Sequence, residues 1–318
     1  MRSALLCLVV GVFLSLPFVA SAQSIAYAAG NDTLYRIDFG TRRAEQVGTF
    51  SVPGAPIQIF DVEGLAFAPD GVLFGVVDNL PGGALIRVNT ATGRATIVGD
   101  MGLQGQGANG SNNRDFGLAA TCDGRLFASS DTSSRLWEVN RDTGATRLVG
   151  DMGAKISGLA SKADGLYGFG VDGDEGLYKL DTETAHATLI AHLTGLNILD
   201  AGLDFDAAGN LWAVLDLTPV FFSDIARIDL TTGLLADRSR VTGNGLDGGV
   251  NSKELEALAI SPPICEPGGF EPTPPAPIPA LSQHATLGAA VMFALAGLVG
   301  IFSRRHPVCR KPSRCRQQ

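Results

Sequence analysis

Between about residues 24 and 261, hydrophobic and polar residues alternate with a period of two, and glycine or aspartate ends each short apolar run. This alternation predicts β-strands, because successive side chains of a strand point to opposite faces. An amphipathic helix would instead place its apolar residues three and four positions apart. We therefore predict an all-β domain made of many short strands.

The predicted strands belong to a repeating unit. Each unit begins with a Gly-Leu-Ala-like run, and these runs lie at 64–67, 117–120, 158–161, 202–205 and 257–260. A tight turn follows each of the first four runs: Asp70-Gly71, Asp123-Gly124, Asp164-Gly165 and Gly209-Asn210. Such pairs between apolar runs are typical of β-hairpins, because both residues tolerate positive φ.

A second turn signal occurs later in each unit. It has the pattern Asn/Asp-x-x-Thr-Gly or a close variant, at 89–93, 140–144, 181–185 and 229–233. Two hairpins of short strands in each unit of about 40–55 residues are typical of the four-stranded blades of a β-propeller.

The two ends of the repeat region predict how the ring closes. Residues 24–50 provide only the last three strands of a unit, and residues 255–261 provide only a first strand. Together they make one composite blade, with four complete units between them. We therefore predict a five-bladed β-propeller that is closed by pairing of its N- and C-terminal strands, which removes exposed sheet edges.

Charge is unevenly distributed along the 318 residues, whose net charge is −8. The last fifteen residues carry six basic residues and no acid, and Arg2 is the only charge in the leader. Once these seven positive charges are set aside, the rest of the chain carries −15. An acidic body disfavours nucleic acid as a partner, because phosphates would be repelled.

The N-terminus has the features of a signal peptide over residues 1–22. Arg2 precedes an apolar run at 4–19, and Ala20-Ser21-Ala22 is a small-x-small cleavage site. Export is therefore expected, and a retained N-terminal anchor is the alternative.

The C-terminus predicts a membrane segment beyond a spacer. Residues 263–279 are rich in proline, which favours an extended linker after the propeller at 23–262. Residues 287–302 are apolar throughout and are followed by Arg304 and Arg305, as expected for a transmembrane helix whose basic flank stays in the cytoplasm. Residues 307–318 would then be a basic cytoplasmic tail.

A sequence motif precedes this apolar segment and makes the tail resemble a known sorting signal. Over 280–306 and just before it, the tail resembles the IPTL-CTERM protein-sorting domain, on the strength of Ile278, Pro279, Ala280, Leu281, Arg304 and Arg305. The resemblance implies recognition by an exosortase-type membrane protease. The protein would then be inserted in the membrane by its C-terminal helix and released to the cell surface or extracellular matrix if the tail is cut. A plain single-pass anchor is the alternative. The blades themselves resemble the broad class of bacterial propellers.

Acidic residues predict a candidate site on one face of the disc. Both hairpin turns of each blade lie on one face, whereas the long, variable connections lie on the other, where binding residues are expected. Glu63 and Glu256 occupy corresponding positions in neighbouring blades, and Asp61 and Asp115 also precede innermost strands. Converging carboxylates favour calcium, so these four residues are the candidate metal ligands. The alternative is that the acids serve as turn residues.

Other chemistry has little support in the sequence. His186 and His192 are too far apart on one predicted strand to share a metal, and no nucleophile with a neighbouring base can be named. Cys122 and Cys265 both fall near first-turn positions but in blades that are not adjacent, so their pairing stays open. We predict a binding or matrix protein for an unidentified surface ligand or glycan. The alternative is a metal-dependent propeller hydrolase or lactonase.

Overall fold

The computed structural model describes residues 24–265, apart from residues 56, 108–109, 112–113, 194–196, 218–221, 244–245, 247–253 and 262. The predicted signal peptide, most of the proline-rich linker, and the sorting and transmembrane segments lie outside this range. In the part of the chain that is described, no helix is long and apolar enough to cross a membrane.

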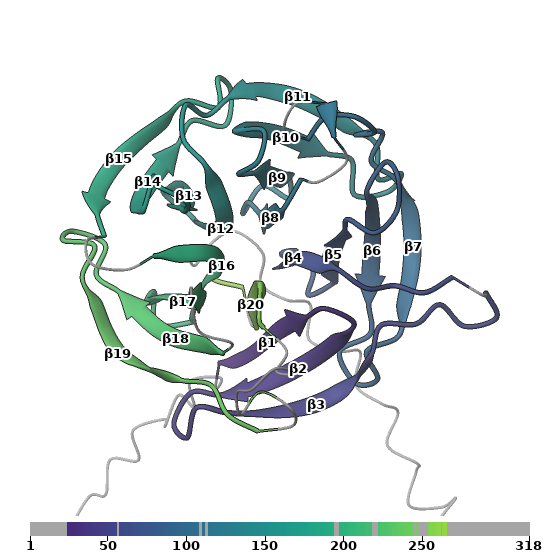
Figure 1. Cartoon of the computed structure of the whole chain (residues 1–318), viewed down its shortest axis with the longest axis horizontal. Helices are drawn as coiled ribbons and strands as arrows, with labels where there is room; N and C mark the ends of the chain where they lie inside the picture. The colour runs from purple at the N-terminus through teal and green to yellow at the C-terminus, as the bar shows by residue number, and fades with distance from the viewer. Residues whose placement is uncertain are drawn as a thin grey trace, which may run out of the picture. The chain divides into compact units, whose positions relative to one another are not determined.

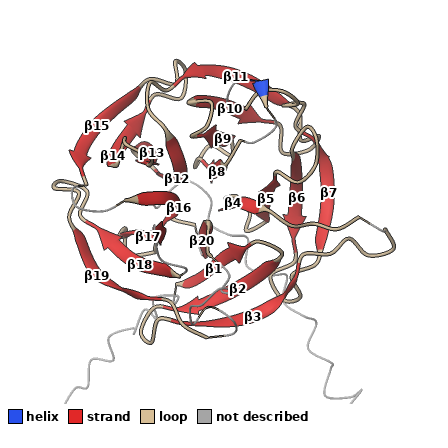
Figure 2. Cartoon of the chain, viewed as in Figure 1, coloured by secondary structure: helices blue, strands red, loops and turns tan. Residues whose placement is uncertain are grey.

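Five four-stranded antiparallel sheets are arranged in a ring, which confirms the predicted five-bladed propeller (Figure 1). Strands build the ring and loops connect them (Figure 2). Four blades are continuous in sequence, and they are listed here from the innermost strand outwards. Blade 2 is β4 (Val62–Phe67), β5 (Leu73–Val77), β6 (Ala84–Val88) and β7 (Ala95–Asp100). Blade 3 is β8 (Phe116–Ala120), β9 (Leu126–Ser130), β10 (Arg135–Val139) and β11 (Thr146–Asp151). Blade 4 is β12 (Ile156–Lys162), β13 (Gly165–Gly170), β14 (Gly176–Leu180) and β15 (Ala187–His192). Blade 5 is β16 (Ile198–Phe205), β17 (Leu211–Leu217), β18 (Ser223–Ile228) and β19 (Leu235–Arg240).

Blade 1 is composite, as predicted. It comprises β20 (Ala257–Ser261), β1 (Ile25–Gly30), β2 (Thr33–Asp38) and β3 (Arg43–Thr49). β1 and β20 are antiparallel, and their register runs from Ile25 opposite Ser261 to Ala29 opposite Ala257. The last strand of the domain therefore completes the sheet that the first strands begin.

The second-turn motif of each blade is explained by local hydrogen bonds. The side chain of its leading Asn or Asp accepts backbone N–H groups two and three residues further on, as Asp181 accepts those of Glu183 and Thr184, both at 2.8 Å. These N–H groups stabilise the ionised form and lower the pKa of Asp181. The motif is thus a structural turn.

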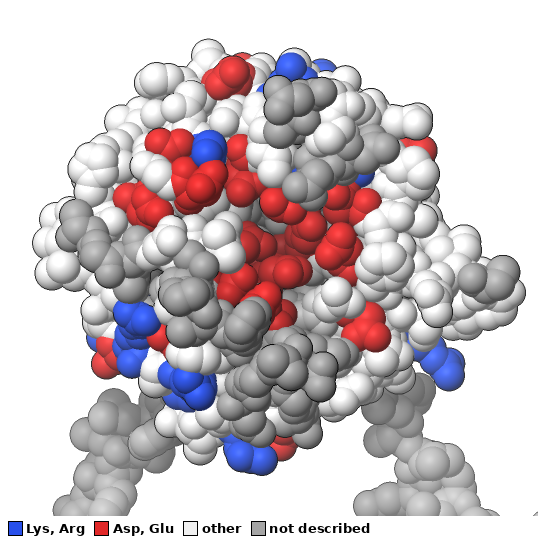
Figure 3. Space-filling model, viewed as in Figure 1, with Lys and Arg blue, Asp and Glu red and all other residues white. Residues whose placement is uncertain are grey.

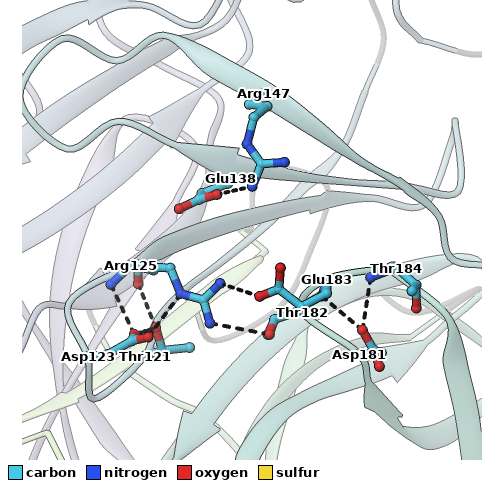
Figure 4. Close-up of polar contacts among 9 residues, drawn as sticks. All are labelled: Thr121, Asp123, Arg125, Glu138, Arg147, Asp181, Thr182, Glu183 and Thr184. Carbon is cyan, nitrogen blue, oxygen red and sulfur yellow. Dashed lines mark hydrogen bonds and ion pairs between the residues drawn. The ribbon is translucent and has the colours of Figure 1, made fainter.

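Charged contacts on this face link neighbouring blades. Arg125, which follows the first turn of blade 3, bonds Asp123 in its own turn at 2.9 Å and reaches Glu183 in the second turn of blade 4, also at 2.9 Å (Figure 4). Its guanidinium also donates to Thr182 at 3.3 Å.

The repeated glycines of the innermost strands are needed because these strands pass close to one another. A Cβ on Gly117 would lie 2.1 Å from the carbonyl oxygen of Ser157, and one on Gly158 would lie 2.4 Å from that of Ala201. Gly64 and Gly202 meet the next blade in the same way. The free space at this level, between strands of all five blades, is only about 10 Å³, about the volume that one water needs.

The base of the channel is covered by chain that the sequence assigns to the linker. Residues 263–265 lie against the innermost strands of blades 2 to 5, where they border a void of about 10 Å³. Cys265 forms a disulfide with Cys122, and the two Cα atoms are 5.4 Å apart. The pairing that the sequence left open is therefore present. Residues from blades that are not adjacent can meet because the chain leaves its own blade after β20 and crosses the axis.

Both ends of the described propeller lie on the face that carries the first turns. Ser24 accepts a hydrogen bond from the backbone N–H of Ala207, in the first turn of blade 5, at 3.1 Å. Cys265 is held by Cys122 in the first turn of blade 3. We call this side the turn face.

Candidate functional site

The opposite face opens into a cavity of about 670 Å³ on the axis of the ring. We call it the acidic mouth, because the described residues that line it are Asp61, Glu63, Asp115, Asp131, Thr132, Lys155, Asp172, Leu199, Asp200 and Glu256. Figure 3 shows acidic side chains gathered at the centre of this face. Because the channel is filled at the level of the glycines, the acidic mouth is a closed-ended basin and does not continue as a pore.

All four carboxylates that the sequence predicts as metal ligands lie in this one cavity. Asp61 and Glu63 come from the start of β4, Asp115 precedes β8, and Glu256 precedes β20. In propeller topology the innermost strands all begin on the same face, which explains why the repeat alignment places them correctly. Among the described residues, however, no three His, Cys, Asp or Glu side chains form a group that could hold a metal ion. Calcium binding therefore stays a prediction.

Glu63 is held between two blades. It is 6% exposed and accepts the backbone N–H of Phe116 at 2.7 Å. Burial raises its pKa well above the usual value, and the negative charges of Asp115 and Asp200 raise it further.

Asp131, directly after β9, is 7% exposed. Burial and the nearby charge of Asp115 raise its pKa to about 7, against the opposing effect of the Thr132 backbone N–H. Its Oδ1 is buried and has no hydrogen-bond partner.

Glu256 and Asp200 interact across the basin from the starts of β20 and β16. Burial is the main cause that raises the pKa of each carboxyl, and the negative charge of Glu256 adds to the effect at Asp200. The Oε2 of Glu256, like the Oδ1 of Asp131, is buried without a hydrogen-bond partner. Two acceptors from different blades are thus left unsatisfied, and unsatisfied buried polar groups are costly.

Lys155 is the one basic side chain among the described residues that line the basin. Its Nζ is paired with the carboxylate of Asp172 and donates to the carbonyl oxygen of Asp172 at 3.1 Å. Seven carboxyl groups therefore face one ammonium group that is already paired. The result is a strong excess of negative charge.

A buried arginine beside the basin was not predicted. Arg114 is fully buried, and its Nε donates to Asp78 at 2.8 Å while a terminal nitrogen donates to the Leu103 carbonyl at 2.9 Å. Burial raises the pKa of Asp78, and the guanidinium acts against that shift. Arg114 therefore fixes the loop before β8 to the end of β5. The sequence offers one signal for it, a basic residue next to Asp115 in an otherwise acidic segment.

The histidines and tryptophans have no part in the acidic mouth. His186 and His192 are exposed at β15 on the outer edge of blade 4. Trp137 and Trp212 lie on different strands of their blades, β10 and β17, as predicted. The indole N–H of Trp212 donates to Asp206 at 2.8 Å, which is a structural contact.

No protein-family model matches the chain. No curated protein matches it either. Among solved structures, it is similar to a chain of a nidogen/laminin complex, with 15% identity and a TM-score of 0.48, covering 76% of this chain and all of that one.

A Bacteroides caccae protein of unknown function is similar with 10% identity and a TM-score of 0.49, covering 74% and 98% of the two chains. Hydrazine synthase of Kuenenia stuttgartiensis is similar over 59% of this chain and 52% of that one, with 18% identity and a TM-score of 0.40. At these values none of the three structures identifies a ligand or an activity for the chain.

Proposed function

We propose that this protein is an exported, non-enzymatic binding protein of the cell surface or extracellular matrix, and that its acidic mouth holds a positively charged ligand. The observation that carries the proposal is the charge of the basin, where seven carboxyl groups surround one paired lysine. A cleft lined by charges of one sign concentrates ions of the opposite sign, because its low-dielectric walls focus the field.

Backbone geometry accounts for only some of these acids. Asp61, Asp115 and Asp172 have φ of 61°, 36° and 50°, a region that aspartate tolerates better than most residues. They fit the reading of the acids as turn residues. The other four, Glu63, Asp131, Asp200 and Glu256, are not among the residues with positive φ. Turn geometry gives no reason for a buried carboxylate at these four positions.

A metal-dependent hydrolase or lactonase is the second candidate. It is favoured by the raised pKa of Glu63 and of Glu256, since a carboxyl group that stays protonated near neutral pH can act as a general acid. Calcium at Glu63, Glu256, Asp61 and Asp115 would supply the Lewis acid. The described lining offers only Thr132 and Lys155 besides the acids and Leu199, and this composition fits binding better than nucleophilic catalysis.

Neutralising two carboxylates tests the proposal against the second candidate. The parent chain and a Glu63→Gln/Glu256→Gln variant are compared for thermal stabilisation by calcium and by spermidine, and for hydrolysis of a panel of esters and lactones. Glutamine at position 63 can still accept the Phe116 N–H, so the fold is expected to persist. We expect at least one cation to raise the Tm of the parent and not that of the variant, with no hydrolysis by either. Hydrolysis by the parent that the variant loses would instead establish the enzyme.

The localisation belongs to the same proposal and has a separate test. The signal peptide at 1–22 and the IPTL-CTERM-like segment at 280–306 support export followed by handling by an exosortase-type protease. Mass spectrometry of the protein recovered from its native cell surface should find an N-terminus near residue 23 and a C-terminus close to residues 278–281. A C-terminus at Gln318 would favour the plain membrane anchor.

A further inference from the structure

The acidic mouth is suited to an organic cation of some size. Its volume of about 670 Å³ falls in the range of small-molecule pockets and far exceeds that of a single ion. Calcium needs six to eight oxygen ligands at 2.3–2.6 Å, and the described side chains include no group of three that could hold a metal ion. The carboxylates are spread around a basin instead of a point.

The unsatisfied acceptors also favour a ligand with several N–H donors. Asp131 is more than nine-tenths buried, lines the basin, and its Oδ1 has no hydrogen-bond partner. The Oε2 of Glu256 is in the same situation on another blade. A guanidinium carries five N–H donors and an ammonium three, and neither has an acceptor. A bare metal ion provides no donor for either oxygen.

Apolar side chains stand beside the acids. Leu199 lines the basin and is 50% exposed, and Phe60, which directly precedes Asp61, is 41% exposed. Ile57, in the same segment, is 41% exposed. Lysine and arginine side chains have aliphatic stems that pack on apolar surface while the charged group reaches a polar site. A basic side chain within an apolar peptide sequence therefore matches both parts of this face, whereas a free polyamine matches only the carboxylates.

From this charge and apolar complementarity, we propose that the acidic mouth docks a protein partner by accepting one of its arginine or lysine side chains, with apolar partner residues against Leu199 and Phe60. The inference rests on the proposed function and specifies its ligand. The charged head lies between Asp131 and Glu256, and it is held by charge-assisted hydrogen bonds, which are roughly twice as strong as neutral ones. Binding weakens with added salt, because part of the attraction comes from the field of the surrounding carboxylates.

Fluorescence anisotropy of the full chain with labelled heptapeptide pools tests the docking. One pool has arginine at its centre and Leu, Ile, Val or Phe on both sides; the other has citrulline, which keeps the shape and loses the charge. We expect the arginine pool to bind at least tenfold more tightly. The proposal is overturned if the two pools bind equally, and this comparison needs no variant.

Two variants then locate the binding. Asp131→Asn/Glu256→Gln should weaken binding of the arginine pool at least tenfold. Asp142→Asn/Glu45→Gln is the matched control, because it removes the same charge from side chains that are 81% and 67% exposed and lie outside the acidic mouth. The control should bind within twofold of the parent. Equal losses in both variants would show that net charge alone is responsible and would contradict docking at the basin.

Calorimetry with calcium and with spermidine separates this inference from the proposed function. Binding of either cation that the Asp131→Asn/Glu256→Gln variant loses, without any preference for arginine over citrulline, leaves a cation-binding mouth and removes the peptide partner. If the parent binds none of the three probes, both proposals fail.

Discussion

Single carboxyl groups at the acidic mouth have opposite effects on binding and on folding. An ionised carboxylate attracts a cation, but in a buried position near other carboxylates it opposes folding. Asp131 illustrates this, since its pKa is raised to about 7, against about 4 for an unfolded aspartate. The folded state thus takes up a proton that the unfolded state does not hold at pH 6.

The dependence of stability on pH follows from this difference. A raised pKa in the folded state means that stability falls as pH rises from about 4 towards 7, because the unfolded chain binds fewer protons over that interval. Burial also raises the pKa of Asp216 to about 6, with the same sign. The lowered pKa values of Asp38 and Asp229 act with the opposite sign, but only below about pH 4.

We therefore predict that the free energy of unfolding, measured by urea titration, is larger at pH 5 than at pH 8. The contribution of Asp131 is at most about 4 kcal/mol for a shift of about three pKa units. In Asp131→Asn the difference between the two pH values should become smaller. A parent chain more stable at pH 8 than at pH 5 would contradict the burial of these carboxyls.

Within single strands, the Gly-Leu-Ala repeat reflects how closely the blades approach the axis. The glycines leave room for the neighbouring strand, and the leucines that follow them, such as Leu65 and Leu118, are about 2% exposed and fill the core between blades. At the equivalent position of β20 the chain has Ala257, so the ring tolerates one methyl group there.

Gly117→Ala tests this close packing. The added Cβ would lie 2.1 Å from a backbone oxygen of β12, and backbone cannot move away as the end of a flexible side chain can. We expect a loss of about 3 kcal/mol or more in the free energy of unfolding, at the upper end of what overpacking costs. Gly40→Ala is the control, because its nearest neighbour is a side-chain oxygen 3.3 Å away in an exposed turn. A loss of less than about 1 kcal/mol in Gly117→Ala would argue against this packing.

The strands, the blades and their closure could be predicted because they depend on local signals. Strand alternation and turns such as Asp70-Gly71 are visible within a few residues, and a repeat multiplies each signal. Glu63 and Glu256 could be assigned to one face for the same reason. The contact of Arg114 with Asp78 could not be predicted, because it depends on how two loops of neighbouring blades fold over each other. Nor could the pairing of Cys122 with Cys265, which requires the path of the chain after β20.

At the scale of the whole molecule, this disulfide fastens the end of the domain to the opposite part of the ring. The two cysteines are separated by 143 residues, and a cross-link over so long a loop restricts the unfolded chain strongly. The pairing of β1 with β20 closes the ring in any case, so the bond reinforces a closure that is already present.

The variant Cys122→Ser/Cys265→Ser should therefore keep its β-sheet circular dichroism and lose roughly 2–5 kcal/mol of unfolding free energy. The parent after reduction should match it. If the variant is as stable as the oxidised parent, the cross-link makes no contribution beyond that of the strand pairing.

The position of both chain ends on the turn face has a consequence for how the protein is displayed. An innermost strand of five residues separates the turn face from the acidic mouth by roughly 16 Å, at about 3.3 Å per residue. Any support to which either end is attached is on the side of the turns. The carboxylates consequently point towards the surrounding medium, where a soluble or neighbouring-cell partner can reach them without passing the attachment.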